Sequence, residues 1–152
     1  MDRSYDSVVS PSERVIFVRW LVWMLVLNLG WEVLHFPLYT FPTSSIPFYK
    51  AYAVVHCTLG DGLIAAATYV GAALLAGWRW PLDAPRRGLA VVLPLGIAYA
   101  AYSEWRNVYI TGSWAYDTVM PTVANIGISP LAQWLVLPSV AVWLLRRIQR
   151  AH

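Results

Sequence analysis

Four long apolar runs separated by short polar connections dominate the pattern of the chain. The runs cover approximately residues 15–39, 51–77, 88–109 and 129–145. A helix needs roughly 20 mostly apolar residues to cross about 30 Å of hydrocarbon, and each run meets that length within the range that helix tilt allows. The pattern therefore predicts an all-α integral membrane protein, a four-helix transmembrane bundle in which residues 15–148 form a single domain.

The polar connections predict how the helices are joined. The connections at 40–50 and 78–87 hold two prolines each, and proline ends helices and favours turns, so both are expected to be tight hairpin loops. The connection at 110–125 is longer and carries Trp114 and Tyr116, and we expect it to pack as an aromatic cap over the helix ends. Residues 1–14 contain three acidic residues and no apolar segment, which predicts a cytoplasmic tail rather than a cleavable signal peptide.

Composition and charge support the membrane assignment and give an orientation. Hydrophobic residues make up 59% of the chain and charged residues only 12%, against about a quarter charged in soluble domains. The net charge of +3 does not indicate nucleic-acid binding, because the arginines lie in short clusters beside the apolar runs. Cytoplasmic loops are enriched in Lys and Arg. Only Lys50 and Arg106 lie on one side, and the other side holds Arg3, Arg14, Arg19, Arg79, Arg86, Arg87, Arg146, Arg147 and Arg150.

This asymmetry predicts a multi-pass membrane protein in which both termini are cytoplasmic and the connections at 40–50 and 110–125 face outward. An ionisable residue inside a span costs about 2.5 to 3.5 kcal/mol on insertion scales, so each needs an explanation. Five acidic or histidine residues fall inside the predicted spans, namely Glu32, His35, His56, Asp61 and Glu104. These five residues are therefore the first candidates for a functional site.

These polar residues fall at similar depth in different helices. Asn28, Glu32 and His35 are spaced by four and three residues, which places them in one stripe along a helix. Asp61 lies near the middle of the second span, and its neighbours Gly60 and Gly62 allow a helix or ligand to approach closely. The later spans bring further polar and aromatic residues to the same outer half. We therefore expect an outward-opening polar pocket, roofed by the 110–125 connection and lined by Asn28, Trp31, Tyr99, Tyr102, Arg106, Asn107, Trp114, Tyr116 and Gln133.

Three chemical interpretations of this pocket remain open. Glu32 and His35 form a Glu-x-x-His pair, which with His56 suggests a zinc or iron site. The two histidines could instead ligate haem b. A structural alternative is an interhelical network of hydrogen bonds in which Arg106 pairs with Glu104 or Glu32.

Acid–base chemistry is the interpretation that we favour. Glu32, Asp61 and Glu104 are the candidate catalytic residues, because low-dielectric surroundings favour the neutral form of an acid and so a proton donor. Aromatic side chains around such an acid would stabilise the cation formed when a lipid alkene or epoxide is protonated. The same Trp and Tyr residues also fit an ordinary interfacial belt.

Two resemblances add to these expectations. The run Asn28-Leu-Gly-Trp31-Glu32 is similar to the Asn-x-x-Trp-Glu run of the membrane-bound terpene cyclases of fungal meroterpenoid pathways, which implies that Glu32 acts as an acid; those enzymes have more spans. The chain as a whole resembles small bacterial inner-membrane proteins of unknown function. The matching segments are HCTLGD at 56–61, GSWAY at 112–116 and SPLAQWLV at 129–136. This second resemblance implies a location and no activity.

Three functions follow as hypotheses. The first is an enzyme that acts on a lipid or isoprenoid, which predicts a pocket between the helices. The second is a metal-binding or haem-binding membrane protein, which predicts bound metal or a Soret band. The third is an accessory subunit that joins a membrane protein partner or a second copy of itself, which predicts that the polar stripe faces outward.

Overall fold

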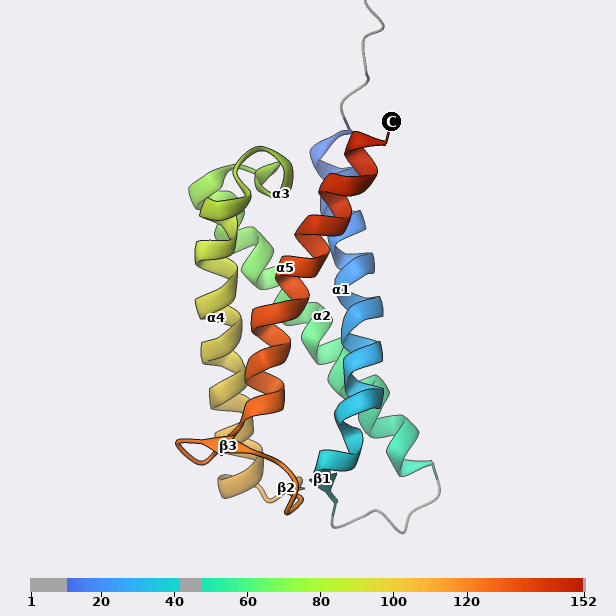
Figure 1. Ribbon diagram of the computed structural model, residues 1–152, viewed down its shortest axis with the longest axis vertical. Coiled ribbons are helices and arrows are strands. Elements are labelled where there is room, and N and C mark those ends of the chain that lie inside the picture. The colour runs from blue at the N-terminus through green and yellow to red at the C-terminus, as the bar shows by residue number, and fades with distance from the viewer. Residues whose placement is uncertain (1–10, 42–47, 152) are drawn as a thin grey trace, which may run out of the picture.

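The computed structural model describes residues 11–41 and 48–151, most of them in helices (Figure 1). The long helices are α1 (Glu13–His35), α2 (Tyr49–Ala76), α4 (Pro85–Trp105) and α5 (Ile128–Arg150). Shorter helical segments are α3 (Trp80–Asp83), the 3-10 turn Phe36–Leu38 and the π-helical turn Arg106–Ile110. Four two-residue strands occur, namely β1 (Tyr39–Thr40), β2 (Ala115–Tyr116), β3 (Thr122–Val123) and β4 (Ile126–Gly127).

The long helices form a bundle in which each packs against two others. α1 contacts α2 and α5, and α4 contacts the same two helices from the other side. The start of α1 and the end of α5 lie at one end of the bundle, and the short strands lie at the opposite end (Figure 1). By length and composition three helical segments are apolar enough to cross a membrane, Glu13–Leu38, Tyr49–Ala76 and Ile128–Arg150. The prediction of a helical protein is thus confirmed, and three of its helical segments are long and apolar enough to cross a membrane.

Several helix ends differ from the predicted ones, and proline explains most of the differences. α1 ends at His35 rather than at 39, because Pro37 lies in a separate 3-10 turn that begins at Phe36. The connection at 78–87 is not a simple loop. Pro81 and Pro85 lie at the first positions of α3 and α4, where proline costs no backbone hydrogen bond. α5 continues through its arginines to Arg150, beyond the predicted end at 145.

Large aromatic side chains pack against glycines and fix α4 to its neighbours. Trp80 and Trp134 are almost fully buried. A Cβ atom placed on Gly88 would lie 1.9 Å from Trp80, and one placed on Gly96 would lie 2.2 Å from Trp134. Because no side chain larger than hydrogen fits at these two positions, the glycines set how closely α4 approaches α3 and α5.

The 110–125 connection folds back over the end of α1. Tyr39 pairs with Tyr116 and Thr40 with Ala115 in the β1–β2 ladder, and β3 and β4 form a second antiparallel pair. The Asp117 amide donates to the Leu38 carbonyl over 2.9 Å. The connection is therefore positioned to cap one end of the bundle. The predicted cytoplasmic tail at 1–14 and the predicted loop at 40–50 lie mainly outside the described residues.

Candidate functional site

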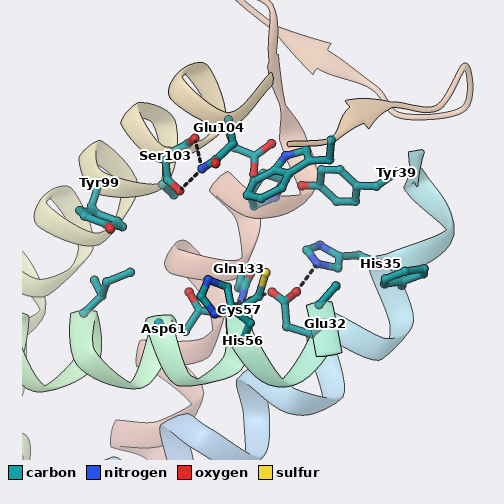
Figure 2. A pocket seen from close by; sticks show the side chains of 18 of the residues that line it. Glu32, His35, Tyr39, His56, Cys57, Asp61, Tyr99, Ser103, Glu104 and Gln133 are labelled. Atoms are coloured by element: carbon teal, nitrogen blue, oxygen red, sulfur yellow. Dashed lines mark hydrogen bonds and ion pairs between the residues drawn. The ribbon is translucent and has the colours of Figure 1, made fainter. Parts of the chain in front are cut away.

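A pocket of about 290 Å³ lies at the strand-bearing end of the bundle (Figure 2). The predicted candidates that line it include all three acids and both histidines: Glu32, His35, His56, Asp61, Tyr99, Glu104, Arg106, Asn107, Trp114 and Gln133. Its exposed lining residues include His56 on α2 and Tyr99 on α4, so the pocket reaches the surface of the bundle between these helices. The volume is near the lower limit of about 300 Å³ for ligand pockets.

The polar stripe of α1 faces the interior of the bundle. Asn28 is fully buried, Glu32 is 8% exposed and His35 is partly buried. The opposite face of α1 presents exposed valines and leucines, as expected for a helix that meets lipid. The stripe spacing thus correctly placed these three side chains on one face, and that face contributes Glu32 and His35 to the pocket.

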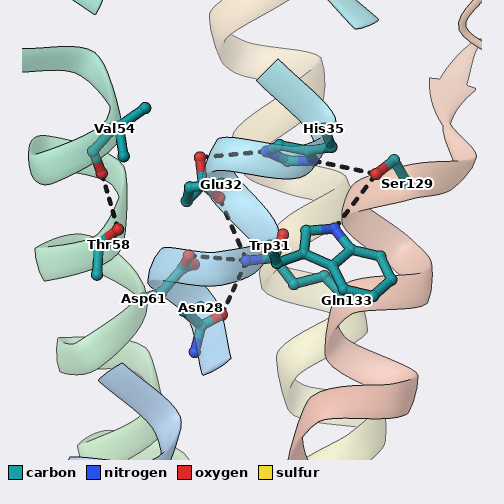
Figure 3. A network of polar contacts seen from close by, with 9 residues as sticks. All are labelled: Asn28, Trp31, Glu32, His35, Val54, Thr58, Asp61, Ser129 and Gln133. Atoms are coloured by element: carbon teal, nitrogen blue, oxygen red, sulfur yellow. Dashed lines mark hydrogen bonds and ion pairs between the residues drawn. The ribbon is translucent and has the colours of Figure 1, made fainter. Parts of the chain in front are cut away.

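Gln133 of α5 joins the stripe to α2 (Figure 3). Its Nε2 atom lies 2.8 Å from Asn28 Oδ1, 2.9 Å from Asp61 Oδ2 and 3.2 Å from Glu32 Oε1. Asn28 Nδ2 donates to the Met24 carbonyl, which turns its Oδ1 atom toward Gln133. One buried amide therefore connects three helices and draws two carboxyl groups together.

The acceptors around Gln133 outnumber its hydrogens. A primary amide nitrogen carries two hydrogens, and three oxygen atoms surround Nε2. The Asp61 carboxyl also interacts directly with the Glu32 carboxyl. Buried acceptors are normally satisfied. The remaining acceptor is satisfied if one carboxyl group carries a proton and donates it to the other.

His35 connects Glu32 to a second chain of donors. Its Nε2 atom lies 3.2 Å from Glu32 Oε2, and its Nδ1 atom lies 3.0 Å from the Ser129 hydroxyl. Trp31 Nε1, which can only donate, lies 3.2 Å from the same hydroxyl. In the arrangement that gives every donor an acceptor, Trp31 donates to Ser129, Ser129 to His35, and His35 to Glu32 (Figure 3). This arrangement orients the Glu32 carboxyl.

The glycines beside Asp61 have different surroundings. A Cβ atom on Gly62 would lie 2.7 Å from Leu25 Cδ2, so Gly62 permits the close approach of a neighbouring helix, which is α1. A Cβ atom on Gly60 would meet nothing within 4 Å, and Gly60 lines the pocket. His56 is exposed and stacks on Tyr52, with ring centroids 5.5 Å apart.

Glu104 lies on the opposite side of the pocket from Glu32 and Asp61 (Figure 2). It is 6% exposed, and its Oε2 atom is fully buried. Trp114 Nε1 and the Tyr116 hydroxyl are buried as well, and with Tyr39 they are the hydrogen-bonding neighbours of the Glu104 carboxyl. Three aromatic side chains therefore direct polar atoms toward this one carboxyl.

The two tyrosines beside Glu104 remain neutral at ordinary pH. Burial raises the pKa of Tyr39 far above its usual range, and the negative charge of Glu104 raises it further. Burial also raises the pKa of Tyr116, and the charge of Glu104 adds to this effect. Both phenols therefore keep their protons and can donate hydrogen bonds to the Glu104 carboxyl.

Other predicted residues are arranged less simply. Arg106 lines the pocket but is exposed, and among the described residues no ion pair joins it to Glu104 or Glu32. Asn107 donates to the Ser103 carbonyl of its own helix. Tyr102 is exposed and packs against Trp105 rather than in the pocket lining.

The geometry does not favour the metal interpretation. Within the described part of the chain, no three His, Cys, Asp or Glu side chains are placed to hold one metal ion. Both ring nitrogens of His35 are engaged, by Glu32 and by Ser129. His56 lies at the exposed edge of the pocket, stacked on Tyr52. The histidines therefore fit polar and aromatic contacts better than ligation.

Sequence reasoning missed several residues of this site. Ser129 was seen only as the start of a helix, and Tyr39 and Cys57 were not assigned to the pocket that they line. Ser129 and Gln133 are four residues apart and so lie on one face of α5, and this spacing was the available signal.

Comparison of the chain with protein-family descriptions, with curated proteins and with solved structures gives no match.

Proposed function

We propose that the protein is a membrane-embedded enzyme that uses Glu32 and Asp61 for acid–base chemistry on a carbon–carbon double bond of an isoprenoid or a similar lipid. The observation that carries this proposal is the pair of carboxyl groups held by Gln133 at the pocket wall. A structural network would need no cavity beside it. Here both acids line an open space that reaches the surface between α2 and α4.

The hydrogen-bond count supports a proton held within this pair. Two carboxylates so close together would repel each other in apolar surroundings, and a shared proton removes the repulsion. His35 donates to the far oxygen of Glu32 and keeps the carboxyl oriented. The pair can then give a proton to a substrate carbon and take one back.

The proposed reaction balances without any further reactant. The carboxyl pair transfers its proton to one carbon of the double bond, and the neighbouring carbon becomes cationic. Aromatic faces that line the pocket, among them Tyr99 and Trp134, stabilise this cation. The carboxylate then removes a proton from the adjacent carbon, so the double bond has moved by one position and the enzyme has regained its proton.

The membrane arrangement that we propose has four spans. α4 has 21 residues, is comparable in length with α1 and α5, and packs between α2 and α5. With the arginine-rich ends cytoplasmic, the pocket lies in the outer half of the bilayer of a bacterial inner membrane. A lipid could then enter sideways between α2 and α4, where His56 and Tyr99 are exposed.

The alternatives have less support. An accessory subunit would present its polar stripe to a partner, whereas Asn28 and Glu32 are buried within the bundle. A metal-binding protein would need His35 to give up contacts with Glu32 and Ser129. The similarity of Asn28-x-x-Trp31-Glu32 to the terpene cyclase run also favours Glu32 as an acid.

Deuterium incorporation tests the proposal. The purified protein, reconstituted in phospholipid vesicles in D₂O, would be incubated with C15 to C30 isoprenoids and the products analysed by mass spectrometry. We expect deuterium to enter at carbons next to a double bond. Glu32→Gln and Asp61→Asn should abolish incorporation, whereas Asp83→Asn, the same kind of change at the exposed Arg79–Asp83 pair, should leave it unchanged. Equal incorporation by wild type and Glu32→Gln would refute the proposal.

A further inference from the structure

We infer that Arg106 binds the acidic head of the ligand, so that the pocket takes an amphiphile whose head carries a phosphate or a carboxylate. This inference rests on the proposed function for the identity of the unsaturated hydrocarbon. The head site itself depends on Arg106 and not on the Glu32 and Asp61 pair, so the two can fail separately.

The positive charge of Arg106 has no counterpart in the bundle. Among the described residues that line the pocket, Arg106 is the only arginine or lysine. Its side chain is exposed, and within the described part of the chain it makes neither an ion pair nor a hydrogen bond. A guanidinium group is always charged and carries five N–H donors. Arg106 therefore presents unused donors that a molecule in the pocket can reach.

The charges around the pocket select an anionic head and fix where it lies. A guanidinium binds a carboxylate or a phosphate through two parallel hydrogen bonds, whereas it repels a cation and gives an alcohol no gain from charge. The rest of the lining is acidic, since it includes Glu32, Asp61 and Glu104. An anion is therefore held at Arg106, and the part of the ligand that lies near the acids is uncharged.

Ser103 adds a neutral donor beside Arg106. It precedes Arg106 by three positions, about one helical turn, and it also lines the pocket. The Ser103 hydroxyl accepts from Asn107 Nδ2 over 3.3 Å, and no acceptor among the described residues takes the hydroxyl hydrogen (Figure 2). This hydrogen is available for a further oxygen atom of a head bound at Arg106.

The position of Arg106 fits an amphiphile. Arg106 begins the π-helical turn that follows α4, at the strand-bearing end of the bundle. α2 starts at this same end (Figure 1), and Asp61 follows its first residue, Tyr49, by 12 positions, roughly 18 Å along the helix. A head bound at Arg106 thus lies at the polar end of the bundle, and its hydrocarbon chain extends inward to the carboxyl pair.

Competition binding tests the inference without any turnover. The probe is tritiated geranylgeranyl phosphate bound to the purified full-length protein in mild nonionic detergent, displaced by the unlabelled phosphate, by the carboxylic acid of the same chain, by geranylgeraniol or by inorganic phosphate. We expect the phosphate or the carboxylic acid to bind at least about tenfold more tightly than the alcohol, because only an anion forms charge-assisted hydrogen bonds with Arg106. Equal displacement by the alcohol would overturn the inference. Displacement by inorganic phosphate at the same concentration would also overturn it and would assign Arg106 to a free anion.

Variants locate the preference for the acidic head. Arg106→Gln removes the charge, and we expect it to reduce the preference at least about fivefold, whereas Arg106→Lys keeps the charge without the planar fork and should retain part of it. Lys50→Gln is the matched control, because it removes the positive charge at the start of α2 and Lys50 does not line this pocket. It should keep the full preference. An unchanged preference in Arg106→Gln, or an equal loss in Lys50→Gln, would contradict the inference.

The two proposals are separated by combining this assay with deuterium incorporation. A head-group preference that is lost in Arg106→Gln, in a wild-type protein that incorporates no deuterium, would keep the head site and remove the proposed function. Deuterium incorporation by a wild-type protein that binds the alcohol as tightly as the acids would keep the proposed function and remove the head site.

Discussion

Replacing Gln133 by methionine tests whether the buried amide holds the bundle together. Methionine has a similar length and shape but cannot hydrogen-bond to the oxygen atoms of Asn28, Glu32 and Asp61, which lie 2.8 to 3.2 Å from Gln133 Nε2. Gln149→Met is the matched control. It lies on the same helix, and its side chain makes no hydrogen bond within the described part of the chain.

The expected loss of stability can be worked from these contacts. The two amide hydrogens form one hydrogen bond to a neutral acceptor and one to an acidic acceptor. In soluble proteins the first kind contributes about 0.5 to 1.5 kcal/mol to stability and the second about 1.5 to 3 kcal/mol. Interhelical hydrogen bonds in membranes average nearer 0.6 kcal/mol each. We therefore expect Gln133→Met to lower the free energy of unfolding by roughly 1 to 4 kcal/mol, and Gln149→Met by no more than about 0.5 kcal/mol.

Reversible unfolding in mixed micelles, followed by circular dichroism, would measure both changes. Asp61→Leu allows a second test, in which the two changes are combined. Without Gln133 the Asp61 carboxyl loses its amide partner, so Gln133→Met combined with Asp61→Leu should cost less than the sum of the single changes, by about 0.5 to 3 kcal/mol. A Gln133→Met protein as stable as wild type, or strictly additive changes, would refute the reasoning about the network.

The remaining predictions concern the pocket, the packing and the tyrosines. Gly60→Ala should leave both stability and deuterium incorporation intact because a Cβ atom there meets nothing within 4 Å, whereas Gly60→Phe should fill the pocket and abolish deuterium incorporation. Gly96→Ala should lower the thermal unfolding temperature, because its Cβ atom would lie 2.2 Å from Trp134; an unchanged temperature would contradict the packing. Burial raises the pKa of Tyr39 and of Tyr116 above the unfolded value of about 10, so their contribution to stability is present below pH 10 and is lost as pH rises above it. Tyr39→Phe should reduce this alkaline loss of stability, as measured by unfolding at a series of pH values.

The helices could be predicted from the sequence because crossing a bilayer requires a long apolar run. Their ends were less predictable. Pro81 and Pro85 were interpreted as loop residues, although proline is also common in the first turn of a helix. Pro37, by contrast, did end α1 early. A proline marks a helix boundary, but by itself it does not say on which side of the boundary the helix lies.

The site could be predicted only as far as helical periodicity reaches. The stripe of Asn28, Glu32 and His35 follows from their spacing within one helix. Contacts such as that between His35 and Ser129, 94 positions apart in the sequence, depend on how the helices are placed against each other, which no local pattern reveals. The pairing of Arg106 with Glu104, which the structural alternative included, did not form. Residues two positions apart on a helix are rotated by about 200° about its axis, so the side chains of Glu104 and Arg106 point away from each other.

The central claim is that Glu32 and Asp61 share a proton beside the pocket. Infrared spectroscopy of the reconstituted protein at neutral pH measures this directly, because a protonated carboxylic acid has a carbonyl band distinct from that of a carboxylate. We predict that such a band is present in wild type, is weakened in both Glu32→Gln and Asp61→Asn, and is unchanged in Asp83→Asn. A band of equal strength in all four proteins, or no band in wild type, would contradict the proposed acid.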